Sequence, residues 1–170
     1  EGDSIKVYDN RFDEPLVEVN GSSRESLNGI LTNFIFASSK QYFKGIPETT
    51  DLLLEGIWFD DAIELSTLIA QPSSSTDIRL ESQLRLSEDS IEFRGKPSDI
   101  VILDDQWNFN PSNSITIASG DIGIRNFEIY DQSEAIHVSG NISSMNESTV
   151  RITVEDLNMD KANLISDVNF

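Results

Sequence analysis

Much of the second half of the chain alternates between apolar and polar residues with a period of two. The apolar positions of three such segments are Ile122 and Ile124, then Ile136 and Val138, then Val150, Ile152 and Val154. Successive side chains of a β-strand point to opposite faces, so this period places the Ile and Val residues on one face and the polar residues on the other. The pattern predicts a sheet with one apolar face.

The same alternation is cleanest in residues 77–86. Its apolar side consists of Ile78, Leu80, Leu84 and Leu86, and Ser82 is the only interruption. Arg79, Glu81, Gln83 and Arg85 occupy the other side. A strand of this kind is typical of an antiparallel sheet that is solvated on one face.

Segments that favour strands follow one another along the whole chain, separated by residues that favour turns. We predict strands over Ser4–Asp9, Leu16–Asn20, Leu27–Ala37, Asp51–Phe59, Ala62–Ala70, Asp77–Ser87, Ser90–Arg94, Ile100–Leu103, Gln106–Phe109, Ser114–Ala118, Asp121–Tyr130, Ala135–Ile142 and Thr149–Glu155. The turns between them are rich in Asn, Asp, Gly and Ser, which suit antiparallel hairpins. The pairs Asp9–Asn10, Asn20–Gly21, Asp60–Asp61 and Glu88–Asp89 are examples.

Only residues 38–46 and 160–168 look helical or irregular. Neither is long enough to support a series of βαβ crossovers, so a parallel α/β fold is disfavoured. The sequence therefore predicts an all-β fold with at most one or two short helices. We expect residues 1–170 to form a single unit, an antiparallel meander that makes an open, one-sided or taco-like sheet.

The composition suits a thin sheet. Hydrophobic residues make up 38% of the 170 positions, against roughly 45–50% in globular proteins when Gly is included. A thick, closed core would need nearly all of them. We see neither a signal peptide nor a long apolar run, and expect a piece of a longer protein whose membrane anchor lies outside this sequence.

The charge balance narrows the range of partners. Thirty acidic and twelve basic residues give a net charge of −18, which disfavours binding to nucleic acid or to anionic headgroups. The chain has no Cys, so it can form neither a disulfide nor a thiolate metal site.

No pattern of residues points to catalysis. The only His, His137, falls on the polar side of its predicted strand and has no Ser-His-Asp context. The paired carboxylates Asp60–Asp61 and Asp104–Asp105 occur where hairpin turns are expected, and Asp is ordinary there. We therefore expect no enzymatic activity.

One stretch near the end partly matches a calcium-binding loop. Asp156, Asn158 and Asp160 have the right spacing, but Lys161 stands where such a loop needs Gly. A capped turn is the better interpretation, so we expect no bound metal and no cofactor.

Three passages resemble one known family. Residues 98–117 run from Ser-Asp-Ile-Val-Ile-Leu-Asp-Asp-Gln-Trp to Ser-Ile-Thr-Ile. Residues 122–140 then carry an Asn-Phe pair, a Gln-containing turn and a strand that ends in Gly, and residues 150–164 end in Leu-Asn-Met-Asp followed by a short helical segment. Together they resemble TamB-like envelope proteins of the Bacteroidetes group. The resemblance is strongest over about residues 80–170 and rests on pattern alone over residues 1–48.

The resemblance implies a location and a role. Proteins of this family, related to AsmA-like and bridge-like lipid transfer proteins, have an inner-membrane anchor and a periplasmic β-sheet folded into a taco-like trough. They support outer-membrane biogenesis as phospholipid conduits or in outer-membrane protein assembly. The implied partners are phospholipid or other apolar chains, an outer-membrane β-barrel protein and the rest of the parent chain, and no active site comes with them.

The alternating residues are the predicted lining of a lipid groove. The eleven candidates are Ile78, Leu80, Leu84, Leu86, Ile122, Ile124, Ile136, Val138, Val150, Ile152 and Val154. Acyl chains gain about 0.8 kcal/mol per buried CH₂ on such a surface. The alternative is that the same residues interdigitate as the closed core of a sandwich.

A second hypothesis makes the chain a carbohydrate- or protein-binding β-sandwich. Trp58, Trp107 and Tyr130 would then form an exposed platform that stacks on sugars, and the acidic residues would bind calcium. Trp107 follows the turn residues Asp104–Asp105, where an aromatic side chain can serve a platform or a core, and we expect it in the core.

Overall fold

The computed structural model describes residues 3–24, 29–143, 145 and 147–156. All fourteen strands of this part belong to one antiparallel sheet, so the predicted all-β meander is confirmed. The strands are β1 (Ser4–Val7), β2 (Asn10–Asp13), β3 (Leu16–Arg24), β4 (Gly29–Tyr42), β5 (Thr49–Phe59), β6 (Ala62–Gln71), β7 (Thr76–Leu86), β8 (Ser90–Gly95), β9 (Asp99–Ile102), β10 (Asp105–Phe109), β11 (Ser114–Ala118), β12 (Asp121–Tyr130), β13 (Ala135–Ile142) and β14 (Thr149–Glu155). A single 3₁₀ turn, Pro72–Ser74, joins β6 to β7 in the described part of the chain.

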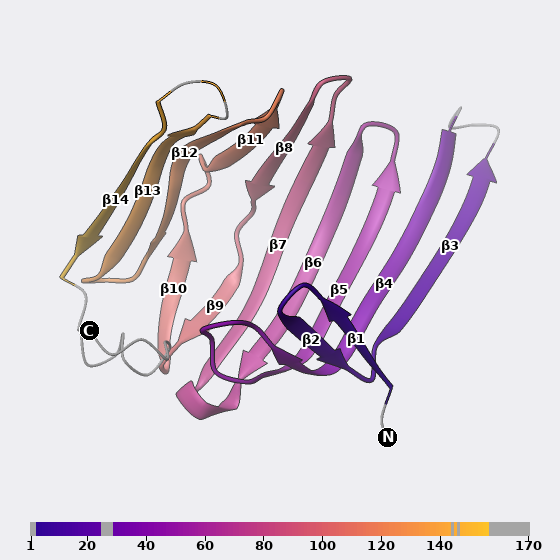
Figure 1. Cartoon of the computed structure of the whole chain (residues 1–170), viewed down its shortest axis with the longest axis horizontal. Helices are drawn as coiled ribbons and strands as arrows, with labels where there is room; N and C mark the ends of the chain where they lie inside the picture. The colour runs from indigo at the N-terminus through magenta and orange to yellow at the C-terminus, as the bar shows by residue number, and fades with distance from the viewer. Residues whose placement is uncertain (1–2, 25–28, 144, 146, 157–170) are drawn as a thin grey trace.

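Three lanes of the sheet are each built from two short strands placed end to end (Figure 1). Strands β2 and β3 both pair with β4, β8 and β9 both pair with β7, and β10 and β11 both pair with β12. Pro15 lies between β2 and β3, where its missing N–H and the positive φ of Glu14 (48°) interrupt the ladder. The chain therefore runs as a simple up-and-down meander despite its number of strands.

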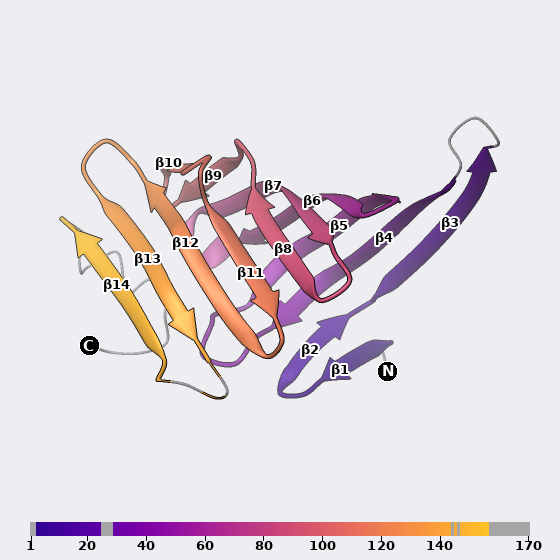
Figure 2. The same cartoon turned by 90° about the horizontal axis from the view of Figure 1, so that it is seen from above.

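The sheet is strongly twisted. From above, β11–β14 run crosswise to β3 and β4 (Figure 2). Each pair of neighbouring strands contributes a small rotation of fixed hand, and the rotations add up over a sheet this wide.

Cross-strand register fixes which side chains share a face, because directly paired residues of an antiparallel sheet lie on the same side. One row of pairs crosses the sheet from β5 to β14 through Trp58, Ile63, Leu84, Phe93, Ile115, Ile124, Gly140 and Val150. We call the side of the sheet that carries this row the apolar face.

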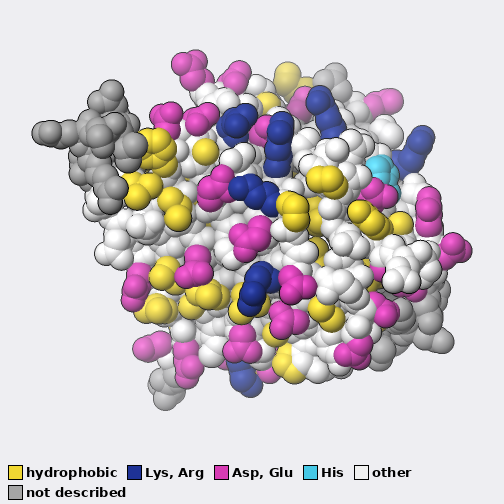
Figure 3. All heavy atoms as spheres, turned by 180° about the vertical axis from the view of Figure 1, so that it is seen from behind, with side chains coloured by type: hydrophobic (Ala, Val, Ile, Leu, Met, Phe, Trp, Pro, Cys, Tyr) yellow, Lys and Arg dark blue, Asp and Glu magenta, His cyan; other side chains and the backbone are white. Residues whose placement is uncertain are grey.

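The opposite side of the sheet, the polar face, carries charged and amide side chains. A neighbouring row runs through Ile57, Glu64, Gln83 and Arg94. Seen from behind, Lys, Arg, Asp and Glu side chains are spread among scattered apolar ones (Figure 3). We therefore expect the polar face to contact solvent.

The buried core is small. Among the described residues only Ile100, Trp107 and Phe109 are buried hydrophobic side chains, at 4%, 3% and 8% exposure. The neighbours that pack against them are Ile78, Leu80, Ile102, Phe127 and Ile129, which come from β7, β9 and β12. We call these eight residues the Trp107 cluster.

The Trp107 cluster is stabilised where the lanes are interrupted. The amide of Asn113, in the gap between β10 and β11, accepts from Gly95 N at 2.7 Å and donates to Gly95 O at 2.9 Å. Asn113 is 1% exposed, and it replaces ladder bonds that the end of β8 would otherwise lack. The Phe109 ring lies directly over Gly95, where an added Cβ would stand 2.5 Å from it.

Three local predictions were wrong. Asn20–Gly21 forms no turn, because β3 continues through both residues and pairs with β4. Residues 38–46 are not helical or irregular up to Tyr42, because β4 continues through them and pairs with both β2 and β5. The first turn is at Tyr8–Asp9, and Asn10 already begins β2. The predicted short helix at 160–168 lies outside the described residues.

Candidate apolar-ligand surface

The eleven predicted groove residues all lie on the apolar face. Those of β7 are Ile78, Leu80, Leu84 and Leu86, and the other seven come from β12, β13 and β14. Register joins the second group into one tract: Val138 pairs with Phe127 and Ile152, and Ile136 pairs with Ile129 and Val154. Their lipid-lining role stays a prediction.

Strands β8 and β11 connect the two groups through apolar residues that are not among the eleven predicted ones. Ile91 and Ile117 link Leu86 to Ile122, and Phe93 and Ile115 link Leu84 to Ile124. Their signal in the sequence is the same alternation on shorter strands, Ile-x-Phe and Ile-x-Ile. The apolar face is therefore continuous from β7 to β14.

Much of this face is open to solvent. Ile152 is 65% exposed, Val154 49%, Ile117 47% and Val150 40%. None of the eleven candidates is buried, and no second layer of the described residues covers them. The candidates of β14 thus form an exposed surface, whereas Ile78 and Leu80 are part of the Trp107 cluster.

A β-bulge keeps β12 in phase with this face. Ile124 pairs with Gly140 and Phe127 pairs with Val138, so Arg125 and Asn126 together oppose a single residue of β13. Asn126 adopts a positive φ of 46°. The extra residue places both Ile124 and Phe127 on the apolar face, where a regular strand would turn Phe127 to the other side.

Charged groups of the polar face pair with one another. Glu64 contacts the Lys96 ammonium and accepts from the Gln83 amide at 2.7 Å. The hydrogen bond from Lys96 lowers the pKa of the Glu64 carboxyl, with a further contribution from Gln83. Polar contacts of this kind make this side less suited to an apolar ligand than the apolar face.

The connection between β4 and β5, residues 43–48, crosses the lower ends of β6 and β7 (Figure 1). We call it the strap. With the sheet below, it bounds a pocket of about 260 Å³ that is open on one side. The apolar lining comes from Phe43, Ile46, Ile69, Ala70, Ile78 and Ile102.

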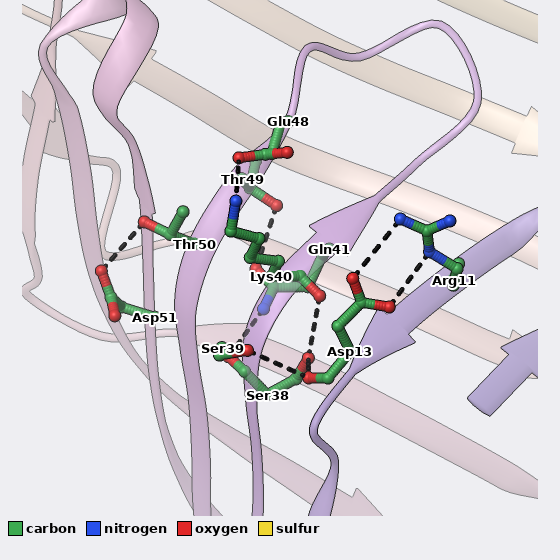
Figure 4. Close-up of polar contacts among 10 residues, drawn as sticks. All are labelled: Arg11, Asp13, Ser38, Ser39, Lys40, Gln41, Glu48, Thr49, Thr50 and Asp51. Atoms are coloured by element: carbon green, nitrogen blue, oxygen red, sulfur yellow. Dashed lines mark hydrogen bonds and ion pairs between the residues drawn. The ribbon is translucent and has the colours of Figure 1, made fainter. Parts of the chain in front are cut away.

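Polar contacts hold both ends of the strap (Figure 4). Lys40 binds Glu48 at 3.2 Å, and Thr49 donates to the buried Gln41 side chain at 3.1 Å. A hydrogen bond from the Tyr42 hydroxyl and then that from Lys40 lower the pKa of Glu48, while Glu48 raises the pKa of Lys40. The Gln41 amide in turn donates to Ser38 O at 2.7 Å.

Contacts from neighbouring elements also hold the middle of the strap. The Phe43 ring makes an edge contact with Phe12 of β2, with ring centroids 5.7 Å apart. Lys44 binds Asp9 at 3.1 Å, and Gln71 donates to Pro47 O at 3.4 Å. The strap is therefore an anchored part of the fold.

The aromatic platform of the second hypothesis is not formed. Trp107 is buried at 3% exposure, as expected for a core residue, and Tyr130 lies on the polar face opposite Asn108 and Ala135. Trp58 is 44% exposed and donates its Nε1–H to Asp60 O. The three rings do not form one surface.

The other candidates for chemistry are placed as ordinary turn and strand residues. His137 lies on the polar face between Glu128 and Thr153. Among the described residues, carboxylate oxygens of Asp105, Asp131 and Glu134 lie within 4.8 Å of one another. Asp131 there caps the turn after β12 by accepting from the amides of Ser133 and Glu134, both at 2.6 Å. The calcium-like spacing that starts at Asp156 lies almost wholly outside the described residues.

No match came from comparison with known proteins. Family models, curated sequences and solved structures were all searched without one. The resemblance to TamB-like proteins therefore rests on the sequence passages alone. In the described residues, no helix has the length and apolar character needed to span a membrane.

Proposed function

We propose that this chain is a non-enzymatic cell-envelope module whose apolar face holds the acyl chains of phospholipids. The observation that carries the proposal is the continuous apolar face from β7 to β14, on which Ile152 is 65% exposed and no described element covers it. Exposed apolar patches larger than a few hundred Å² mark binding surfaces in soluble proteins. We therefore infer that the apolar face binds an apolar partner.

An acyl chain suits this face because the side chains along it offer contact area and little hydrogen bonding. Each CH₂ that moves from water onto the face contributes up to about 0.8 kcal/mol. The gain depends on area and not on direction, so a row of Ile and Val can hold a chain without a specific site for each carbon. Holding of this kind needs no catalytic residue.

The charge distribution favours single lipid chains, rather than a membrane surface, as the partner. The net charge of −18 opposes contact with anionic headgroups. Acidic side chains of the polar face also keep that side solvated. The module is thus suited to shielding lipid tails from water, and unsuited to lying on an anionic bilayer.

The sequence resemblance suggests the cellular setting for this activity. By that analogy the module lies in the periplasm, belongs to a longer chain anchored in the inner membrane, and supports outer-membrane biogenesis. Phospholipid transport between the membranes and assistance to outer-membrane β-barrel proteins are the two forms this support takes in the family. In both cases the partner would present an extended apolar surface to the module.

The test compares two adjacent residues of β13 that lie on opposite faces. Val138 is on the apolar face and His137 is on the polar face, and both are partly exposed. Val138→Asp and His137→Asp add the same charge one residue apart. Native mass spectrometry of the purified proteins after incubation with phospholipid measures the bound lipid.

We expect the wild-type chain and His137→Asp to retain lipid and Val138→Asp to lose most of it, with Ile124→Asp behaving like Val138→Asp. Circular dichroism checks that each variant is folded, because a charge on a packed face also destabilises a protein. A folded wild-type protein that binds no lipid, or that binds glycans in a calcium-dependent way instead, would overturn the proposal.

A further inference from the structure

The pocket beneath the strap differs from the rest of the apolar face because it is covered. Residues 43–48 lie over the ends of β6 and β7, and Phe43 and Ile46 face Ile69, Ile78 and Ile102 across about 260 Å³. We propose that this pocket receives the methyl end of a single acyl chain that lies along the apolar face. The inference rests on the proposed function and assigns the ligand an orientation.

The polar side chains of the pocket wall are already satisfied by the protein. Thr49 donates to Gln41, and Gln71 donates to Pro47 O. Thr76 accepts from Ser74 at 2.9 Å. These atoms are already engaged by the protein, so a headgroup would gain few hydrogen bonds there, and burying a polar group without a partner is unfavourable. A hydrocarbon end has no such cost.

The size of the pocket also favours a chain end. Sites that enclose a whole small molecule usually measure about 300–1,000 Å³, whereas a dry cavity of about 150 Å³ takes one benzene. At about 260 Å³ the pocket falls between these cases. It can enclose several methylenes and leaves the rest of the lipid outside.

The pocket is continuous with the apolar face. Ile78 and Ile102 belong both to the pocket wall and to the Trp107 cluster. Ile78 also pairs directly with Ile100, which pairs with Trp107. A chain seated in the pocket therefore passes near Trp107 on its way to the open part of the face.

Trp107 provides a reporter for this orientation. A Trp58→Phe variant leaves Trp107 as the only tryptophan, because the chain contains two. Bromine quenches tryptophan fluorescence at short range, so ω-bromo- and α-bromo-hexadecanoic acid report the positions of the two chain ends. We expect the ω-bromo acid to quench Trp107 at least about threefold more strongly.

Two isoleucines of similar exposure supply a matched pair of variants. Ile46 is 46% exposed on the strap and lines the pocket, whereas Ile57 is 50% exposed on the polar face. Ile46→Asp should weaken hexadecanoic acid binding at least about fivefold, roughly 1 kcal/mol, and Ile57→Asp should leave it unchanged. Ile46→Phe keeps the strap apolar but fills space, so it should shift the preference toward shorter acids.

The outcomes separate this inference from the proposed function. Equal quenching by the two bromo acids, together with unchanged binding in Ile46→Asp and Ile46→Phe, would overturn the pocket assignment. The proposed function would still stand in that case if Val138→Asp weakened binding. A folded wild-type protein that binds no acyl chain would overturn both.

Discussion

The Trp107 cluster and the β12–β14 end of the sheet use the same apolar face in opposite ways. Around Trp107, bulky rings and an interrupted ladder bring side chains together until three of them are buried. Across β13 and β14, small β-branched residues stand in regular rows, and Ile152 remains 65% exposed. Identical alternation thus yields a core where large side chains converge and an exposed apolar surface where they do not.

The difference has a structural cause at one pair of small residues. Ser82 of β7 pairs with Gly95 of β8, and the Phe109 ring lies over Gly95 in the space that larger side chains would fill. Phe109 then meets Phe127 edge to face, with centroids 5.1 Å apart. In the described part of the chain nothing comparable reaches over β14, so we expect stability to depend on the first region and binding on the second.

The largest effect on stability is expected from Trp107→Ala. Removing a buried aromatic side chain from the small core should lower the free energy of unfolding by about 3–5 kcal/mol. Trp107→Phe should cost much less, because the buried Nε1–H has no hydrogen-bond partner among the described residues. Urea denaturation measures both, and similar losses for the two variants would show that the cluster is not packed as described.

Asn113→Ala should have the next largest effect. It removes the amide that serves both backbone groups of Gly95, which are buried and would lose their partner. The expected loss is about 1–3 kcal/mol. Asn126→Ala, which changes an exposed amide in the β12 bulge at a positive φ of 46°, is the comparison and should cost less, because it leaves no buried group unpaired. If Asn113→Ala were as stable as wild type, the Asn113 amide could not be stabilising the interrupted lanes through Gly95.

Ile152→Ser should separate binding from stability. The residue is 65% exposed on an edge strand, and substitutions at such positions usually change stability by less than about 0.5 kcal/mol. Lipid binding should nevertheless weaken. The matched change Thr153→Ser, on the polar face of the same strand, should affect neither property, and a large loss of stability in Ile152→Ser would mean that the face is closed.

The smallest effect concerns acid. Lys96 holds the pKa of Glu64 below its usual 4.5, so the pair stabilises the fold above that pH, and the contribution is lost as the pH falls through the lowered value. The two side chains are 43% and 46% exposed, which limits the pair to about 0.2–1 kcal/mol. Glu64→Gln should therefore be slightly less stable than wild type at pH 7, and the difference should disappear once the pH falls below the lowered pKa of Glu64, as thermal unfolding would show.

Local pattern was enough to predict most of the strands and their common face, although it missed β2. Alternation at Ile78, Leu84 and Val138 needs only the two-residue period of a strand, and the structure has these residues on one side of one sheet. The same alternation predicted that His137 lies on the polar face. These features follow from backbone geometry, which every strand shares.

Features that depend on contacts between distant segments could not be predicted in this way. The polar run 38–42 continues as strand because two neighbours pair with it, and Gln41 is buried there by Thr49 and Phe12. The strap forms a pocket only because Phe12 and Gln71 hold it over β6 and β7. Neither contact leaves a periodic trace in the sequence.

Site-specific photo-crosslinking on β14 tests the central claim most directly. A photoreactive benzoylphenylalanine placed at Ile152 projects from the apolar face, and one placed at Thr153 projects from the polar face of the same strand. After illumination with radiolabelled phospholipid, we expect strong labelling from position 152 and little from position 153. Equal labelling from both positions, or labelling from position 153 alone, would contradict it.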